Sequence, residues 1–131
     1  MWGRIFLQNL DGSSDARLKN SITNINEKFN VFFDNLKPVG YKYNNGTSGR
    51  QHFGFIAQDL HMNLNMSNID SIEFAGVCYP NNNEEYYTVR YLEFIPLNTW
   101  QIQKLKPRMT EAEERIYKLE QELVELKSKL I

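Results

Sequence analysis

Residues 102–131 read IQKLKPRMTEAEERIYKLEQELVELKSKLI, and their apolar side chains recur at spacings of three and four. When Ile102 is placed at position a of a seven-residue repeat, all the a and d positions are apolar: Ile102, Leu105, Met109, Ala112, Ile116, Leu119, Leu123, Leu126 and Leu130. An unbroken ladder of this kind is typical of an α-helical coiled coil. The alternative interpretation is a lone helix that packs this stripe against its own domain.

The charged residues beside the ladder favour parallel helices in register. In a parallel coiled coil, position g of one helix faces position e of the next heptad on its neighbour. These pairs are all opposite in charge: Arg108 with Glu113, Arg115 with Glu120, and Glu122 with Lys127. The apolar positions are compatible with two or three strands. Thr110 and Glu113 also form a capping-box pattern, which predicts that the helix restarts after Pro107.

Length and composition exclude several classes of protein. A chain of 131 residues suits one small globular domain with extensions. Its net charge of −1 argues against a nucleic-acid binder. Its mean hydropathy of −0.55 argues against a membrane span. The single Cys78 excludes an internal disulfide, and with only two histidines the composition argues against a zinc site. We expect neither a metal nor a cofactor.

The part of the chain before the ladder has the pattern of a small α+β domain with short strands and helices. Apolar residues at spacings of three and four predict an amphipathic helix that begins near Asp15 and ends before Pro38. The other expected elements are strands over 39–43 and 53–56, a brief helix over 57–64, hairpin strands over 69–79 and 86–91, and a helix from about Leu92. We interpret the tyrosines of these strands as core and subunit-interface residues.

Ser14 precedes Lys19 by five residues, just ahead of the first predicted helix. A serine hydroxyl needs a base to take its proton, and a lysine amine can do so only when neutral, a state that burial favours. Five residues on a continuous helix would leave the two side chains roughly 140° apart, so Ser14 must lie at or before the helix start. The alternative is that Ser14 or Asp15 only caps the helix and that Lys19 is solvated.

The motif Ser14-Asp15-x-Arg17-Leu18-Lys19 is part of a longer pattern. It is followed in order by Leu36-x-Pro38-x2-Tyr41-x-Tyr43, by Gly54-Phe55-Ile56-Ala57-Gln58-Asp59-Leu60, by Val89-x-Tyr91 and by the coiled-coil ladder. The pattern covers about residues 13 to 131. It resembles the intramolecular chaperone domain of phage tailspikes and tail fibres, the peptidase S74 type found at the end of endosialidases and neck appendage proteins.

The resemblance implies a self-cleaving serine endopeptidase that acts once, on its own chain. Such domains follow a β-rich viral fibre, drive its trimerisation and then cut the bond before the motif serine. Carried over to this sequence, Ser14 is the nucleophile, Lys19 is its partner in a Ser/Lys dyad, and Ser13–Ser14 is the scissile bond. His52 is a possible auxiliary residue that would orient the cleavage site, and the alternative is a loop histidine without a role.

The resemblance also predicts domains, partners and location. Residues 1–13 would be a leader from the end of the fibre, 14–101 the globular chaperone and auto-processing domain, and 102–131 the oligomerisation helix. The partners would be two further copies in a homotrimer and the upstream fibre of the same polypeptide, with no nucleic acid and no membrane. The expected location is a virion tail or appendage precursor, assembled in the host cytoplasm.

Two other functions fit the same sequence. One is a non-catalytic trimerisation and capping module of a fibrous protein, in which Ser14 and Lys19 have no chemical role. The other, more distant, is a membrane-anchored transcription factor whose release uses a similar domain. For the self-cleaving domain, we further expect that the site is completed only when neighbouring subunits pack around the leader.

Overall fold

The computed structural model describes residues 12–130, and its secondary structure confirms a mixed fold with a long C-terminal helix. The helices are α1 (Lys28–Asp34), α2 (Ala57–Met66) and α3 (Phe94–Lys129), and single 3-10 turns form η1 (Ala16–Leu18), η2 (Ser71–Glu73) and η3 (Tyr91–Glu93). The strands form two antiparallel pairs, β1 (Val39–Tyr41) with β2 (His52–Gly54) and β3 (Val77–Cys78) with β4 (Thr88–Val89). Most of the predicted leader lies outside the described residues.

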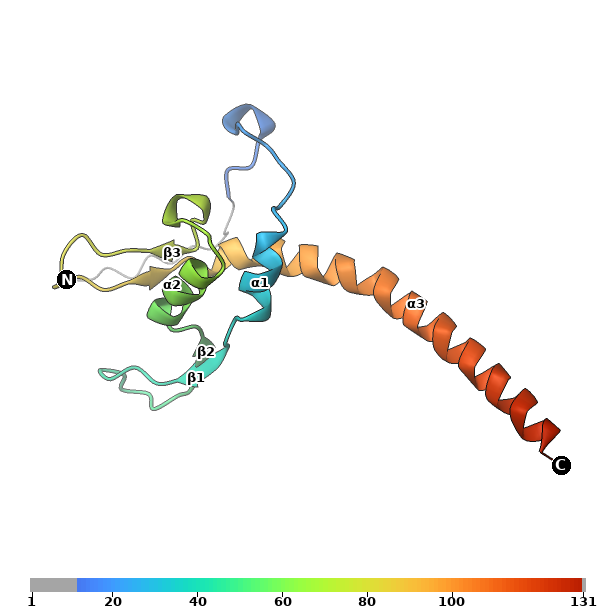
Figure 1. Ribbon diagram of the computed structural model, residues 1–131. Coiled ribbons are helices and arrows are strands. Elements are labelled where there is room, and N and C mark those ends of the chain that lie inside the picture. The colour runs from blue at the N-terminus through green and yellow to red at the C-terminus, as the bar shows by residue number, and fades with distance from the viewer. Residues whose placement is uncertain (1–11, 131) are drawn as a thin grey trace.

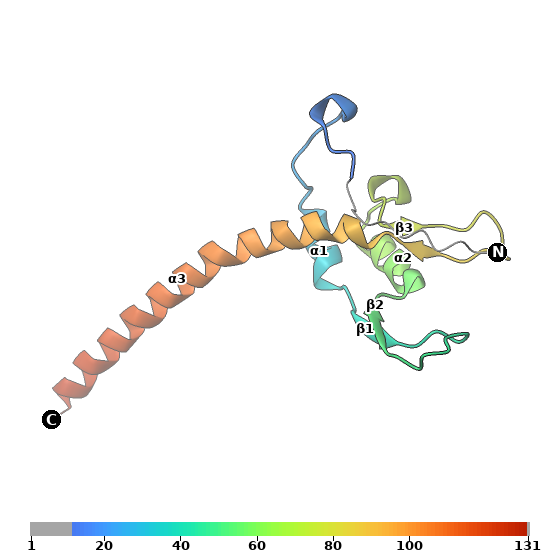
Figure 2. The ribbon, with the colours of Figure 1, turned by 180° about the vertical axis from the view of Figure 1, so that it is seen from behind.

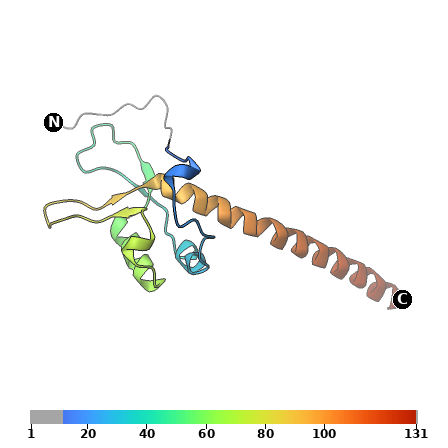
Figure 3. The same ribbon diagram turned by 90° about the horizontal axis from the view of Figure 1, so that it is seen from above.

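The short elements gather around the first turns of α3, and the rest of that helix extends away from them (Figure 1). We call this gathered part, residues 23–100, the head. The same arrangement is seen from behind in Figure 2 and from above in Figure 3. Among the residues described, no helix combines the length and apolarity needed to cross a membrane.

The core of the head is small and aromatic. The ring of Phe32 is fully buried and meets that of Phe74 edge to face, with 5.4 Å between their centroids. Phe74 in turn meets Phe94 edge to face at 5.4 Å. The buried apolar side chains come from α1, α2, the segment between α2 and β3, β3 and α3: Phe29, Phe32, Leu60, Leu64, Ile69, Phe74, Val77, Phe94 and Leu97. Each element therefore depends on the same cluster for its burial.

The prediction of one helix from Asp15 to Leu36 is wrong in its first half. Only η1 forms near Asp15, and residues 19–26 run without regular structure until α1 begins at Lys28. Ser21 has a positive φ of 54°, which a right-handed helix does not allow. The side chain of Asn26 accepts a hydrogen bond from the backbone N–H of Lys28 at 3.0 Å and so helps to start α1 there. Leu18 and Ile22, counted in the predicted stripe, are exposed.

The predicted hairpin is present, but its first strand is much shorter than expected. Val77 pairs with Val89 and Cys78 with Thr88. Before them, the side chain of Glu73 accepts a hydrogen bond from the backbone N–H of Asp70 at 2.7 Å, and Asp70 caps η2 in return. This capping box stabilises the 3-10 turn η2 in place of an extended strand. Local side-chain hydrogen bonds of this kind compete with strand pairing. The strand predicted over 69–79 is therefore limited to its last residues.

Helix α3 has 36 residues and passes Pro107 without a break. The predicted restart at Thr110 is wrong, because the Thr110 hydroxyl donates to the carbonyl of Lys106 at 3.2 Å inside a continuous helix. Beyond Trp100 the ladder is exposed on the single chain, and the exposed fractions of Leu105 and Leu130 are 49% and 80%. The interpretation that the ladder packs against its own domain is therefore wrong.

Replacing Phe32 by Ala should lower the free energy of unfolding by about 3–5 kcal/mol, because it leaves a cavity in the centre of the core. The matched control is Phe53→Ala, since the Phe53 side chain is 81% exposed. We expect the control to change the free energy of unfolding by less than about 0.5 kcal/mol. Urea denaturation at one protein concentration measures both, and equal losses in the two variants would contradict the assignment of the core.

Candidate functional site

Ser14 and Lys19 are brought together by η1. The Lys19 Nζ atom donates a hydrogen bond to the Ser14 Oγ atom over 2.7 Å. Ser14 lies before the turn, and Lys19 ends it with an extended backbone at φ −119° and ψ 151°. A 3-10 helix makes one turn in about three residues, so the side chains on either side of one turn can point back toward each other. The requirement that Ser14 precede the helical turn is met.

Asp15 and Arg17 hold this turn closed. The Asp15 carboxylate caps η1 by accepting from the backbone N–H of Arg17 at 2.9 Å. It also accepts from the guanidinium of Arg17, at 3.0 Å from Nε and 2.8 Å from Nη2. The Arg17 side chain lowers the pKa of the Asp15 carboxyl, and the same contact raises the pKa of Arg17. Asp15 is thus the capping residue, and the Ser14 hydroxyl bonds to Lys19 instead.

The hydrogen-bonded pair lies in water. Ser13, Ser14 and Lys19 are all exposed, and η1 stands away from the head in Figures 1 and 2. The burial that would favour a neutral lysine is therefore not supplied by residues 12–130 of one chain. The geometry alone allows the Lys19 amine, when neutral, to take the proton of the Ser14 hydroxyl. The Ser14 hydroxyl is close to the Ser13 carbonyl along the chain, because Ser14 directly follows Ser13.

His52 lies in β2, not in a loop as predicted, and it belongs to an aromatic cluster. Its ring stacks on Tyr41 with 5.6 Å between centroids and meets Tyr43 edge to face at 5.0 Å. In Figures 1 and 2 the β1–β2 hairpin and η1 project from opposite sides of the head. Within one chain, the structure therefore does not bring His52 to Ser14 and Lys19.

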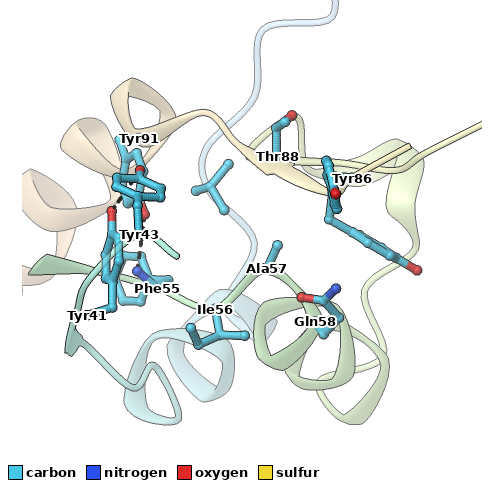
Figure 4. A pocket seen from close by; sticks show the side chains of 11 residues that line it. Tyr41, Tyr43, Phe55, Ile56, Ala57, Gln58, Tyr86, Thr88 and Tyr91 are labelled. Carbon is cyan, nitrogen blue, oxygen red and sulfur yellow. Dashed lines mark hydrogen bonds between the residues drawn. The ribbon is translucent and has the colours of Figure 1, made fainter. Parts of the chain in front are cut away.

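Tyrosines line a hollow of about 540 Å³ between the two hairpins and the start of α2 (Figure 4). The Tyr91 hydroxyl accepts from the backbone N–H of Phe55 at 3.2 Å, and Tyr41 and Tyr43 join their hydroxyls at 3.3 Å. The bond to Tyr43 raises the pKa of Tyr41 to about 12. A side chain at Gly54 would collide with the Tyr91 hydroxyl.

The sequence did not reveal this hollow, because its tyrosines were interpreted as core and subunit-interface residues. The exposed fractions of Tyr43 and Tyr86 are 61% and 90%, so these two are not core residues of the single chain. The sequence did contain a signal for the hollow: its tyrosines cluster in segments that border turns containing glycine or asparagine. Across residues 12–130, no group of three or more His, Cys, Asp or Glu side chains is arranged to hold a metal ion.

Comparison with known proteins identifies related sequences and folds. Residues 14–63 match the Peptidase_S74 family, described as the chaperone of endosialidase, and the match begins at Ser14. The fold is similar to the crystal structure of a novel intramolecular chaperone, with a TM-score of 0.61 and 22% sequence identity. That likeness covers 72% of this chain and 99% of the other. Among curated proteins no sequence matches.

Replacing Arg17 by Ala should return the pKa of Asp15 toward 3.8, because the guanidinium is the main cause of its lowering. A carboxyl whose pKa is lowered on folding stabilises the turn above its ordinary pKa, and this is lost as the pH falls through the lowered value. NMR titration of the Asp15 carboxyl carbon measures the shift. The control Arg50→Ala should leave the titration unchanged, and an unchanged midpoint in R17A would contradict the pairing.

Proposed function

We propose that this chain is an intramolecular chaperone domain of the S74 type, because residues 14–63 match that family and the fold is similar to that of an intramolecular chaperone. It would direct the assembly of a trimeric fibre and then release itself by cutting the Ser13–Ser14 bond. The fibre would be the β-rich part of the same polypeptide, in a viral tail or appendage precursor assembled in the host cytoplasm. The observation that carries the self-cleavage is the 2.7 Å hydrogen bond between Lys19 Nζ and Ser14 Oγ.

The proposed chemistry uses only atoms of η1 and its flanks. The neutral Lys19 amine takes the Ser14 hydroxyl proton as the Oγ atom attacks the carbonyl carbon of Ser13. The ring that forms contains five atoms, from the Ser13 carbonyl carbon to Ser14 Oγ. The bond between that carbon and the Ser14 nitrogen then breaks, and the nitrogen takes up the proton. The resulting ester joins Ser13 to the Ser14 oxygen, and water hydrolyses it to a free Ser13 carboxylate and the Ser14 hydroxyl.

Two features support control of this reaction by assembly. The Lys19 amine is exposed on the single chain, and a lysine amine can act as a base only when it is neutral. The α3 ladder is exposed as well, and its flanking charges suit a parallel partner of the same sequence. Neighbouring subunits that cover η1 would remove it from water and favour the neutral amine. The number three comes from the family resemblance.

A non-catalytic trimerisation and capping module is the second candidate. The observation that favours it is the exposure of both Ser14 and Lys19, since exposed side chains can form such a bond without a chemical role. The two functions differ in one product. Only the self-cleaving domain loses the residues before Ser14, which denaturing mass spectrometry of the purified chain detects directly.

Replacing Ser14 by Ala, or Lys19 by Ala, should slow cleavage by about 10²-fold or more, because each removes one half of the proton transfer. Both variants should still assemble, since neither side chain is buried. Mass spectrometry of the denatured chain reads the fraction cut before Ser14. The control is Ser13→Ala, which keeps the hydroxyl of Ser14 and should cleave nearly as the parent does. Release of residues 1–13 by S14A would refute the assignment of the nucleophile.

Replacing both Leu119 and Leu123 by Asp should dissociate the assembly and prevent cleavage. Each substitution would bury an unpaired carboxylate between helices, which costs several kcal/mol. The control is a chain with Asp at the outward f positions Gln121 and Ser128, which adds the same residues outside the ladder. Sedimentation and mass spectrometry on one sample measure assembly and cleavage together. A monomer that still cuts before Ser14 would show that assembly does not control release.

A further inference from the structure

One side of α3 is occupied by its own head. Phe94 and Leu97 are buried in the core. One turn further on, the amide of Gln101 donates to Asn30 at 2.7 Å, and Lys104 Nζ donates to Asn30 at 2.9 Å. When the heptad is counted back from Ile102, Phe94 and Gln101 fall at g, and Leu97 and Lys104 fall at c. The head is therefore attached along the c and g edge of the helix.

An open groove lies along the other edge of the same turns. Its volume is about 710 Å³, and its floor on α3 includes Ile95, Pro96, Thr99 and Gln103. In the heptad these are positions a, b, e and b. Ile95 is the a position one heptad before Ile102, and its side chain is 57% exposed. The groove thus begins at the a position one heptad before the ladder and lies on the e and b flank of α3.

The heptad geometry determines what faces this flank in a parallel assembly. Successive residues are about 100° apart around the helix axis, so e and b lie on one side of the a/d seam and g and c on the other. The g edge of each helix meets the e edge of its neighbour, as the opposite charges of Arg108 and Glu113 favour. A head attached at c and g therefore projects toward the e and b flank of the neighbouring helix.

We infer that the groove on the e and b flank of α3 is the docking surface for the head of the neighbouring copy. This inference rests on the parallel assembly in the proposed function. Each head covers the groove of the next copy, so the contact runs in one direction around the assembly and closes as a ring. The occupant is a second copy of this chain, because only a copy in register presents its head at the height of Ile95.

The second wall of the groove connects this contact to the Ser14–Lys19 pair. Thr23, Asn24 and Ile25 form that wall, and they follow Lys19 by only a few residues. The same three residues also border another hollow, of about 840 Å³, on the side of Ile72 and Phe74. The wall is therefore flanked by open space in the single chain. A docked head fills the groove against this wall and changes the surroundings of the loop that carries Lys19.

A photoreactive side chain tests the docking surface. p-Benzoylphenylalanine is placed at Gln103, at the edge of the groove, and in a control chain at Gln121, an f position about 27 Å further along the helix. Both chains are sedimented and irradiated, and covalent dimers are separated on a denaturing gel. Mass spectrometry then locates the crosslinked residue. We expect both chains to form trimers. Position 103 should give covalent dimers in which it is joined to residues 23–93 of another copy. Position 121 should give no crosslink to those residues.

The outcomes separate this inference from the proposed function. A trimer in which position 103 crosslinks only within its own chain, only to another α3, or not at all overturns the docking surface and leaves the proposed assembly intact. A monomer overturns both. The photoreactive group at position 103 could occupy the groove itself and block the neighbouring head. A second variant, Thr99→Arg, therefore tests the groove without that group. We expect Thr99→Arg to weaken trimerisation at least tenfold relative to Gln121→Arg, and equal trimer stability would overturn the inference.

Discussion

The packing of Phe94 in the first turn of α3 is the contact on which the rest of the structure depends. Its ring lies 5.4 Å from Phe74 and 5.0 Å from Phe55, so one side chain joins the long helix to the centre of the head and to the β1–β2 region. Leu97 and Gln101 add contacts with the head on the same side of the helix. This anchoring fixes which edge of α3 the head occupies, and so it also determines which edge remains for another chain.

The Ser14–Lys19 pair is organised by different forces. It depends on the local bonds of Asp15 and Arg17, and none of the residues of η1 is buried. A turn held by exposed charges is weakly stabilised by itself, because water and salt screen its ion pair. The pair is therefore correctly arranged but fully hydrated in the single chain. In the proposed control by assembly, a neighbouring subunit that covers this turn would exclude water from the amine and keep the 2.7 Å contact with Ser14 in place.

Much of the fold could be predicted where periodicity is strong. The long helix, the β3–β4 hairpin, strands near β1 and β2, and a brief helix predicted over 57–64 follow from apolar spacing and turn residues. The errors occur where local side-chain bonds compete with that periodicity. Asn26 starts α1 late, the Asp70 and Glu73 capping box replaces a strand, and Thr110 bonds within the helix that it was expected to restart. A single stripe of apolar residues does not reveal such competition.

The amino-acid sequence specifies the ladder, its matched charges and the five-residue spacing of Ser14 and Lys19, because these are properties of neighbours along the chain. Tertiary structure alone decided that His52 joins Tyr41 and Tyr43, far from η1, and that Lys19 remains in water. It also decided that the head occupies the c and g edge of α3 and leaves a groove on the other. These outcomes depend on how the core orients separate elements in space, which no local pattern in the sequence specifies.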